Sequence, residues 1–232
     1  MHHHYNDLAA LHPTHRRRTT QSLIDMESPN PNLVHTNQIT HDHQLIGDYL
    51  EENKPETTIR IYCQNLNGIK WDKDGGTWPM ICQSISAIYA DIACFSEINQ
   101  DVSQHSLRFQ MDKICKRFFH HHRLVTSTSN CKVRHTYKPG GTAMLTMQNL
   151  SAAAATTTRD RMGRWVSTRF AGKQRTYITV ISAFQVCHQT RFEPNTATAQ
   201  QLTMMIDDNI QAGVTTRISA REAFIQDLQS FI

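Results

Sequence analysis

Residues 58–69, Thr-Ile-Arg-Ile-Tyr-Cys-Gln-Asn-Leu-Asn-Gly-Ile, decide which fold the chain can adopt. Apolar side chains alternate along the first part, with Ile59, Ile61 and Cys63 on one face, and this is the period of a β-strand. The run then meets residues 65–68, a turn-forming cluster. The stretch predicts a strand over 58–64 whose carboxyl end opens into a tight turn.

A helix and a second strand follow. Apolar residues recur at helical spacing from Trp78 to Tyr89, and Pro79 suits the first turn of a helix. Residues 92–95 form a short, continuous apolar run, which is typical of a strand buried on both faces. The order strand, helix, strand predicts a layered α/β or α+β fold.

Further elements continue this pattern to the end of the chain. We expect a helix over 107–118, strands over 123–128, 141–147, 164–170 and 177–184, and a helix over 197–210. An Ala/Thr-rich stretch separates the strands at 141–147 and 164–170. Ser219 and Glu222 form a capping-box pattern, which predicts that a helix begins there and runs to residue 232.

Residues 1–57 differ in composition from the rest of the chain. They are rich in Pro, His, Asn and Gln and poor in aromatic residues, so they bury too little apolar surface to offset the entropy of ordering. We expect a disordered, His-rich polar tail over 1–57 and a folded domain over 58–232. The overall net charge of +4 combines an acidic tail with a basic domain.

Several classes of protein are excluded by simple patterns. No apolar run approaches the ~18–20 residues of a membrane helix, and the N-terminus lacks the apolar core of a secretory signal. The six cysteines form no CxxC pair, which favours buried, reduced thiols. We expect an intracellular protein that is not secreted and contacts no membrane. The Arg16–Arg18 cluster leaves the nucleus open as a location.

Two polar residues stand where catalytic groups often lie, at the ends of predicted strands. Asn65 follows the first strand, and Glu97 follows the second. A carboxylate there suits a hard metal ion, and an amide beside it can orient a phosphate oxygen or a water. The alternative is that Asn65 is a turn residue and Glu97 a solvated strand end.

The motifs favour the functional interpretation. Residues 61–69 resemble the first motif of the endonuclease/exonuclease/phosphatase superfamily, a strand ending in Asn-x-x-Gly. Residues 93–99 are similar to its second motif, a buried strand ending in a metal-binding Glu. Segments 138–145, 163–166 and 180–185 continue in the same order. The set is most similar to the endonuclease-like domains of non-long-terminal-repeat retrotransposons and reverse-transcriptase polyproteins, and it covers residues 58–232.

This resemblance implies a four-layered α/β sandwich that hydrolyses phosphodiesters with Mg²⁺, with DNA nicking as the ancestral activity. Glu97 would bind the metal, and Asn65 would contact the scissile phosphate or support the nucleophile. Asn67 would be a nearby polar partner.

The chain departs from the family pattern in its later part. Phe184 stands where the family has a Tyr, and the Gly-Asp-x-Asn and Ser-Asp-His motifs are absent from the sequence. We therefore expect the N-terminal part of such a domain, incomplete at its C-terminus, through truncation, a pseudogene or an error in the gene model. Activity should be weak or absent unless a partner supplies the complementing C-terminal half.

The stretch from Arg108 to Arg175 is strongly basic and suggests contact with DNA. We expect the basic residues to form one strip along it, with the interleaved Trp165, Phe170 and Tyr177 in the core. The strip comprises Arg159, Arg161, Arg164, Arg169, Lys173 and Arg175, of which Arg159, Arg161, Arg164 and Lys173 are the expected nucleic-acid contacts. Four alternatives stay open: a solvated basic face, a non-catalytic nucleic-acid-binding remnant, a phosphatase of the same superfamily acting on small phosphoesters, and a fragment that does not fold stably.

Overall fold

The computed structural model describes residues 54–55, 57–132, 137–187, 193–213 and 219–232. The predicted tail, residues 1–57, lies almost wholly outside them, and its disorder stays a prediction. Residues 49–232 form one compact unit, and that unit is described below by itself.

The first sheet contains β1 (Ile61–Asn65), β2 (Ile92–Ser96), β3 (His122–Ser127) and β4 (Thr142–Met147) in the order β1-β2-β4-β3. β1 and β2 run parallel, and the other pairs are antiparallel. Helices α1 (Trp78–Ala87) and α2 (His105–Phe118) cover one face of it. The core under the helices includes Trp78 and Phe95, whose rings meet edge to face at 5.5 Å.

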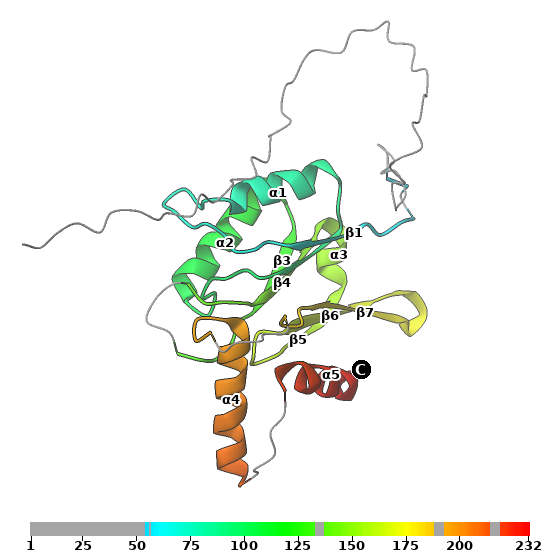
Figure 1. Cartoon of the computed structure of the whole chain (residues 1–232). Helices are drawn as coiled ribbons and strands as arrows, with labels where there is room; N and C mark the ends of the chain where they lie inside the picture. Colours follow the sequence, from blue (N-terminus) through cyan, green and yellow to red (C-terminus); the bar gives the residue numbers. More distant parts are fainter. Residues whose placement is uncertain (1–53, 56, 133–136, 188–192, 214–218) are drawn as a thin grey trace, which may run out of the picture. The chain divides into compact units, whose positions relative to one another are not determined.

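The second sheet contains β5 (Ala154–Arg159), β6 (Trp165–Ala171) and β7 (Tyr177–Ala183), all antiparallel. It packs on the free face of the first sheet, where Met144 meets Val166 and Phe170 in one buried cluster. Helix α5 (Ala220–Phe231) covers the outer face of the second sheet, with the Phe231 ring 4.4 Å from that of Trp165. The layers therefore run helix, sheet, sheet, helix (Figure 1), which confirms the predicted α/β sandwich.

Three further elements join these layers. Helix α3 (Gln148–Ala153) connects β4 to β5, and a short 3-10 helix, η1 (Lys173–Arg175), closes the β6–β7 hairpin. Helix α4 (Ala197–Ala212) packs through Met204 and Met205 against residues that include Val186 of the segment after β7 and Ala223 of α5.

The structure corrects four predictions about local structure. β1 begins at Ile61 rather than at residue 58. The Ala/Thr-rich stretch forms the end of α3 and most of β5, for which the sequence predicted neither a helix nor a strand. Tyr177 was expected in the core, but its side chain is 51% exposed, with the Arg169 guanidinium 3.9 Å from the centre of its ring. Cys63 and Cys187 are exposed rather than buried.

Two details of helix chemistry agree with the sequence. Pro79 occupies the first turn of α1. Ser219 and Glu222 form the predicted capping box at the start of α5, where the Glu222 backbone N–H donates to Ser219 Oγ at 3.1 Å. Among the described residues, no helix is long and apolar enough to cross a membrane.

Candidate active site

The site is built on the parallel pair β1 and β2, whose carboxyl ends lie at the same edge of the first sheet. Asn65 is paired in register with Ser96, so the residues that follow, Asn67 and Glu97, lie in adjacent loops. The Gly68 N–H donates to the Glu97 carbonyl at 2.7 Å. The structure thus brings together the three residues that the sequence singled out as catalytic.

The backbone at this edge adopts conformations that are uncommon for residues with side chains. Asn67 and Glu97 have φ angles of 47° and 51°, in the left-handed region. Such conformations persist only where the surroundings fix them, and they cluster at functional sites. Here the Asn65 Oδ1 atom accepts the Asn67 N–H at 2.9 Å and holds the turn. The Asn65 carboxamide oxygen is therefore engaged by the backbone, whereas the Glu97 side chain is half-buried at the edge.

Asn99 connects this edge to the glycine pair that precedes β4, a role the sequence reasoning missed. Its Oδ1 accepts the Gly140 N–H at 2.7 Å, and its own N–H donates to the Gly140 carbonyl at 2.9 Å. A Cβ atom at Gly68, where φ is +92°, would lie 3.3 Å from Asn99 Nδ2. The close approach to Asn99 explains why glycine suits position 68. The Asn-x-x-Gly spacing was visible in the sequence, but the partner of the glycine was not.

A buried ion pair between Lys138 and Asp101 stabilises the same loops. Lys138 Nζ lies 3.2 Å from Asp101 Oδ1, and the two side chains are 3% and 10% exposed. Burial alone would raise the pKa of Asp101, but hydrogen bonds from Ser103 and Lys138 and the positive charge of Lys138 together hold that pKa below its ordinary value. The pair thus fixes the segment that carries Gly140 and Gly141. Lys138 was part of a motif in the sequence, yet nothing there marked it as buried.

A cavity of about 370 Å³ opens beside Asn65, between the ends of β1, β2 and β7. Ser182 Oγ faces it from β7 and donates to the Phe95 carbonyl at 3.3 Å. Phe184, which stands where the resembling family has a Tyr, lies about 4.0 Å from the position of a Cβ at Gly140. Its ring therefore reaches the glycine pair, but it brings no hydroxyl to the edge.

The side chains at this edge determine which ligands a metal ion could bind there. Among the described residues, no three His, Cys, Asp or Glu side chains converge into a metal-binding group. Mg²⁺ keeps several waters and often takes only one or two carboxylates from the protein. Glu97, which is half-buried, is the carboxylate that the sequence predicted for such an ion, and this role stays a prediction.

The four basic residues expected to contact nucleic acid along one strip are divided by the fold. Arg159, Arg161 and Arg164 lie at one end of the second sheet, around a cavity of about 490 Å³. Lys173 lies in η1, beyond the opposite end of β6. The turn between β5 and β6 and the turn between β6 and β7 lie at opposite ends of β6. The four side chains therefore do not form a continuous strip.

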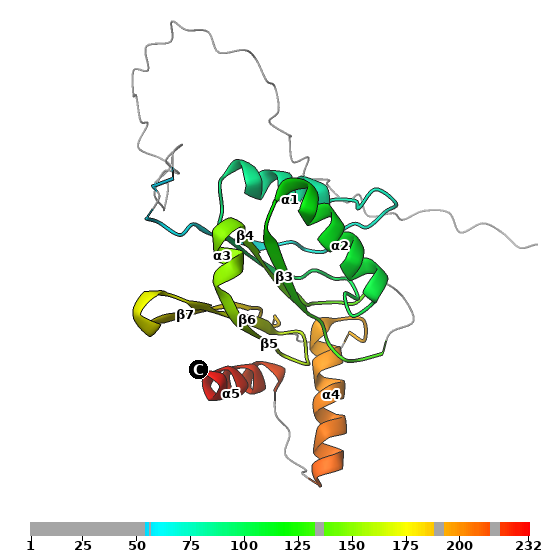
Figure 2. The ribbon, with the colours of Figure 1, turned by 180° about the vertical axis from the view of Figure 1, so that it is seen from behind.

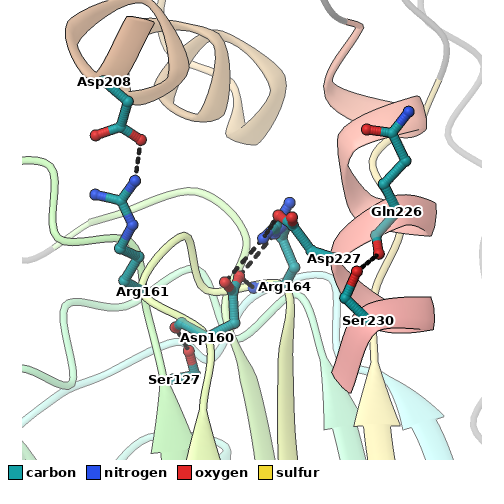
Figure 3. Close-up of polar contacts among 8 residues, drawn as sticks. All are labelled: Ser127, Asp160, Arg161, Arg164, Asp208, Gln226, Asp227 and Ser230. Atoms are coloured by element: carbon teal, nitrogen blue, oxygen red, sulfur yellow. Dashed lines mark hydrogen bonds and ion pairs between the residues drawn. The ribbon is translucent and has the colours of Figure 1, made fainter. Parts of the chain in front are cut away.

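The first three differ further in what they offer to a ligand, and Figure 3 shows the contacts of two of them, Arg161 and Arg164. Arg164 is 2% exposed and forms ion pairs with Asp160, at 2.8 Å, and with Asp227, at 2.6 Å. Arg161 pairs with Asp208 of α4 at the surface. Arg159 is exposed and has no carboxylate partner among the described residues. A role in DNA contact stays a prediction for all four, and Arg159 and Lys173 are the two whose side chains are exposed without an ion-pair partner in the described part of the chain.

The chain is similar to some solved structures at low sequence identity. No protein-family profile and no curated protein matches the chain. One similar structure is an endonuclease/exonuclease/phosphatase family protein from Leptotrichia buccalis C-1013-b, with a TM-score of 0.39 and 14% identity over 68% of this chain and 64% of that one. Another is the human Nocturnin catalytic domain with a bound sulfate anion, with a TM-score of 0.39 and 14% identity over 67% and 59%. The chain spans less than two thirds of either structure.

Proposed function

We propose that this chain is a nucleic-acid-associated domain of the endonuclease/exonuclease/phosphatase type, derived from a retrotransposon endonuclease. In this proposal Glu97 holds a hydrated Mg²⁺ at the edge of the first sheet, and phosphodiester hydrolysis by the chain alone is weak or absent. The observation that carries it is the joining of the Asn65–Gly68 turn to Glu97 through the 2.7 Å Gly68–Glu97 hydrogen bond.

Each residue of the edge has a limited task in this proposal. Glu97 supplies the single carboxylate, and the left-handed backbone at Glu97 and Asn67 sets the loop from which it projects. Asn65 holds the turn through its Oδ1 and leaves its amide group to donate to a phosphate oxygen. A bound Mg²⁺ would stabilise negative charge on a phosphoryl oxygen.

Two groups that the resembling family uses for hydrolysis have no counterpart in this sequence. A general base must lie within hydrogen-bonding reach of the attacking water, and the Ser-Asp-His motif that serves this step in the family is absent. Phe184, the first residue after β7, offers no hydroxyl. The support for weak activity is therefore the composition of the site, and complementation by a second chain would have to supply these groups.

Nicking of supercoiled plasmid in Mg²⁺ tests the proposal. We expect the full chain to relax plasmid no faster than its Glu97→Ala variant, which serves as the matched control for contaminating nucleases. Rapid cleavage that disappears in Glu97→Ala would contradict the weak activity, while leaving Glu97 as the metal ligand.

A further inference from the structure

Helix α2 carries an exposed cationic stripe that the candidate active site does not use. His105, Phe109, Lys113 and Arg117 follow one another at intervals of four residues, so they lie along one side of the helix, and all four are exposed. The helix lies on the outside of the first sheet, beside β3 (Figure 2). This face is therefore open to a partner.

The positive charge of the stripe is not neutralised within the described chain. The only carboxylate of α2, Asp112, is engaged by Lys116 at 3.0 Å and by His122 at 2.9 Å. Neither Lys113 nor Arg117 forms an ion pair with a described residue. These two cations are therefore available to an external anion.

A second observation extends the surface toward the second sheet. Partial burial and then the positive charge of Arg108 lower the pKa of the Arg159 guanidinium, so Arg108 of α2 acts on β5 through its electrostatic field. No described carboxylate forms an ion pair with either of them. Like charges gathered in this way are relieved by a bound anion.

One aromatic ring stands within this cationic surface. Phe109 is 58% exposed, and the described contact of its ring is with the neighbouring His105 ring at 6.3 Å. Exposed aromatic rings among cations are the combination with which proteins bind unpaired bases and their phosphates. An acidic peptide would pair with the cations, but its carboxylates would not stack on the Phe109 ring as a base does.

We propose that the outer face of α2 binds single-stranded nucleic acid, with Arg108, Lys113 and Arg117 on the phosphates and Phe109 stacked on a base. The proposal does not depend on metal binding or hydrolysis at Glu97. It extends the predicted basic surface to a helix on the other side of the first sheet from β5–β7.

Fluorescence anisotropy with labelled oligothymidylate, and in a parallel arm oligouridylate, tests this surface in the full-length Glu97→Ala chain, which removes any cleavage. We expect Lys113→Gln/Arg117→Gln to weaken binding about tenfold and to reduce the log–log salt slope by about 1.4, because each cation on a single strand contributes roughly 0.7. Phe109→Ala should weaken binding about tenfold at every salt concentration without changing the slope.

The matched control is Arg221→Gln, which removes one exposed charge from α5 and should change affinity less than twofold at moderate salt. Circular dichroism of each variant establishes that the fold is retained. A loss in Lys113→Gln/Arg117→Gln no larger than the loss in Arg221→Gln would overturn the proposal. An unchanged affinity in Phe109→Ala, or displacement of the oligonucleotide by polyglutamate as efficiently per charge as by unlabelled oligothymidylate, would also overturn it.

Discussion

Replacing Arg164 with Met is expected to destabilise the folded domain by about 3–5 kcal/mol, because it leaves a buried carboxylate without its cation. Asp160 Oδ1 and Oδ2 accept hydrogen bonds from the Arg164 guanidinium at 2.9 and 2.8 Å, and the Asp160 side chain is 6% exposed. The same guanidinium reaches Asp227 of α5 at 2.6 Å (Figure 3). The substitution therefore also loosens the contact between α5 and the second sheet.

Urea unfolding followed by circular dichroism measures this effect. Arg161→Met is the matched control, because Arg161 also pairs with an aspartate, but both partners are largely exposed, at 53% and 35%. An exposed pair of this kind contributes about 0–1 kcal/mol. If Arg164→Met unfolded at the same urea concentration as Arg161→Met, the buried network would have no structural role.

Lys138→Met is expected to cost about 3 kcal/mol at neutral pH, for a related reason. It removes the cation from a pair in which Lys138 is 3% and Asp101 10% exposed, beneath the glycine pair of the candidate site. The matched control is Lys116→Met, whose exposed pair with Asp112 should change stability by less than about 0.5 kcal/mol.

The pH dependence of this loss follows from the direction of the Asp101 pKa shift. The native pKa lies below its ordinary value, so the contribution of Asp101 to stability is present above about pH 4 and is lost as the pH falls through the native pKa. In Lys138→Met the pKa of Asp101 rises, and a protonated Asp101 no longer needs a cation. The difference in unfolding free energy between wild type and variant should therefore narrow between pH 5 and pH 3 in urea unfolding series; a constant difference would contradict the pairing.

Much of the layered fold could be predicted because its strands and helices carry regular patterns. The continuous apolar run 92–95 became β2, and the helical spacing after Trp78 became α1. α3 and β5 were missed because Ala and Thr residues give no contrast between a buried and an exposed face. Burial in those segments is set by tertiary partners such as Phe170, which the local sequence cannot specify.

The candidate site, like the fold, could be predicted only in part. Asn65 and Glu97 could be placed at one edge, because parallel strands bring their carboxyl ends together. The Asn99–Gly140 contact and the Lys138–Asp101 pair join segments about 40 residues apart, and no periodic pattern encodes such contacts. Arg164 was assigned to a surface strip because a basic residue is rarely buried, and only its two carboxylate partners explain why this one is.

Backbone NMR during a Mn²⁺ titration tests the central claim, that Glu97 holds a divalent cation at the joined ends of β1 and β2. The account predicts paramagnetic broadening of the amide signals of Asn65, Gly68 and Glu97 at Mn²⁺ concentrations that leave α5 unaffected, and loss of this broadening in Glu97→Gln. Broadening that is centred on another surface, or that persists unchanged in Glu97→Gln, would contradict it.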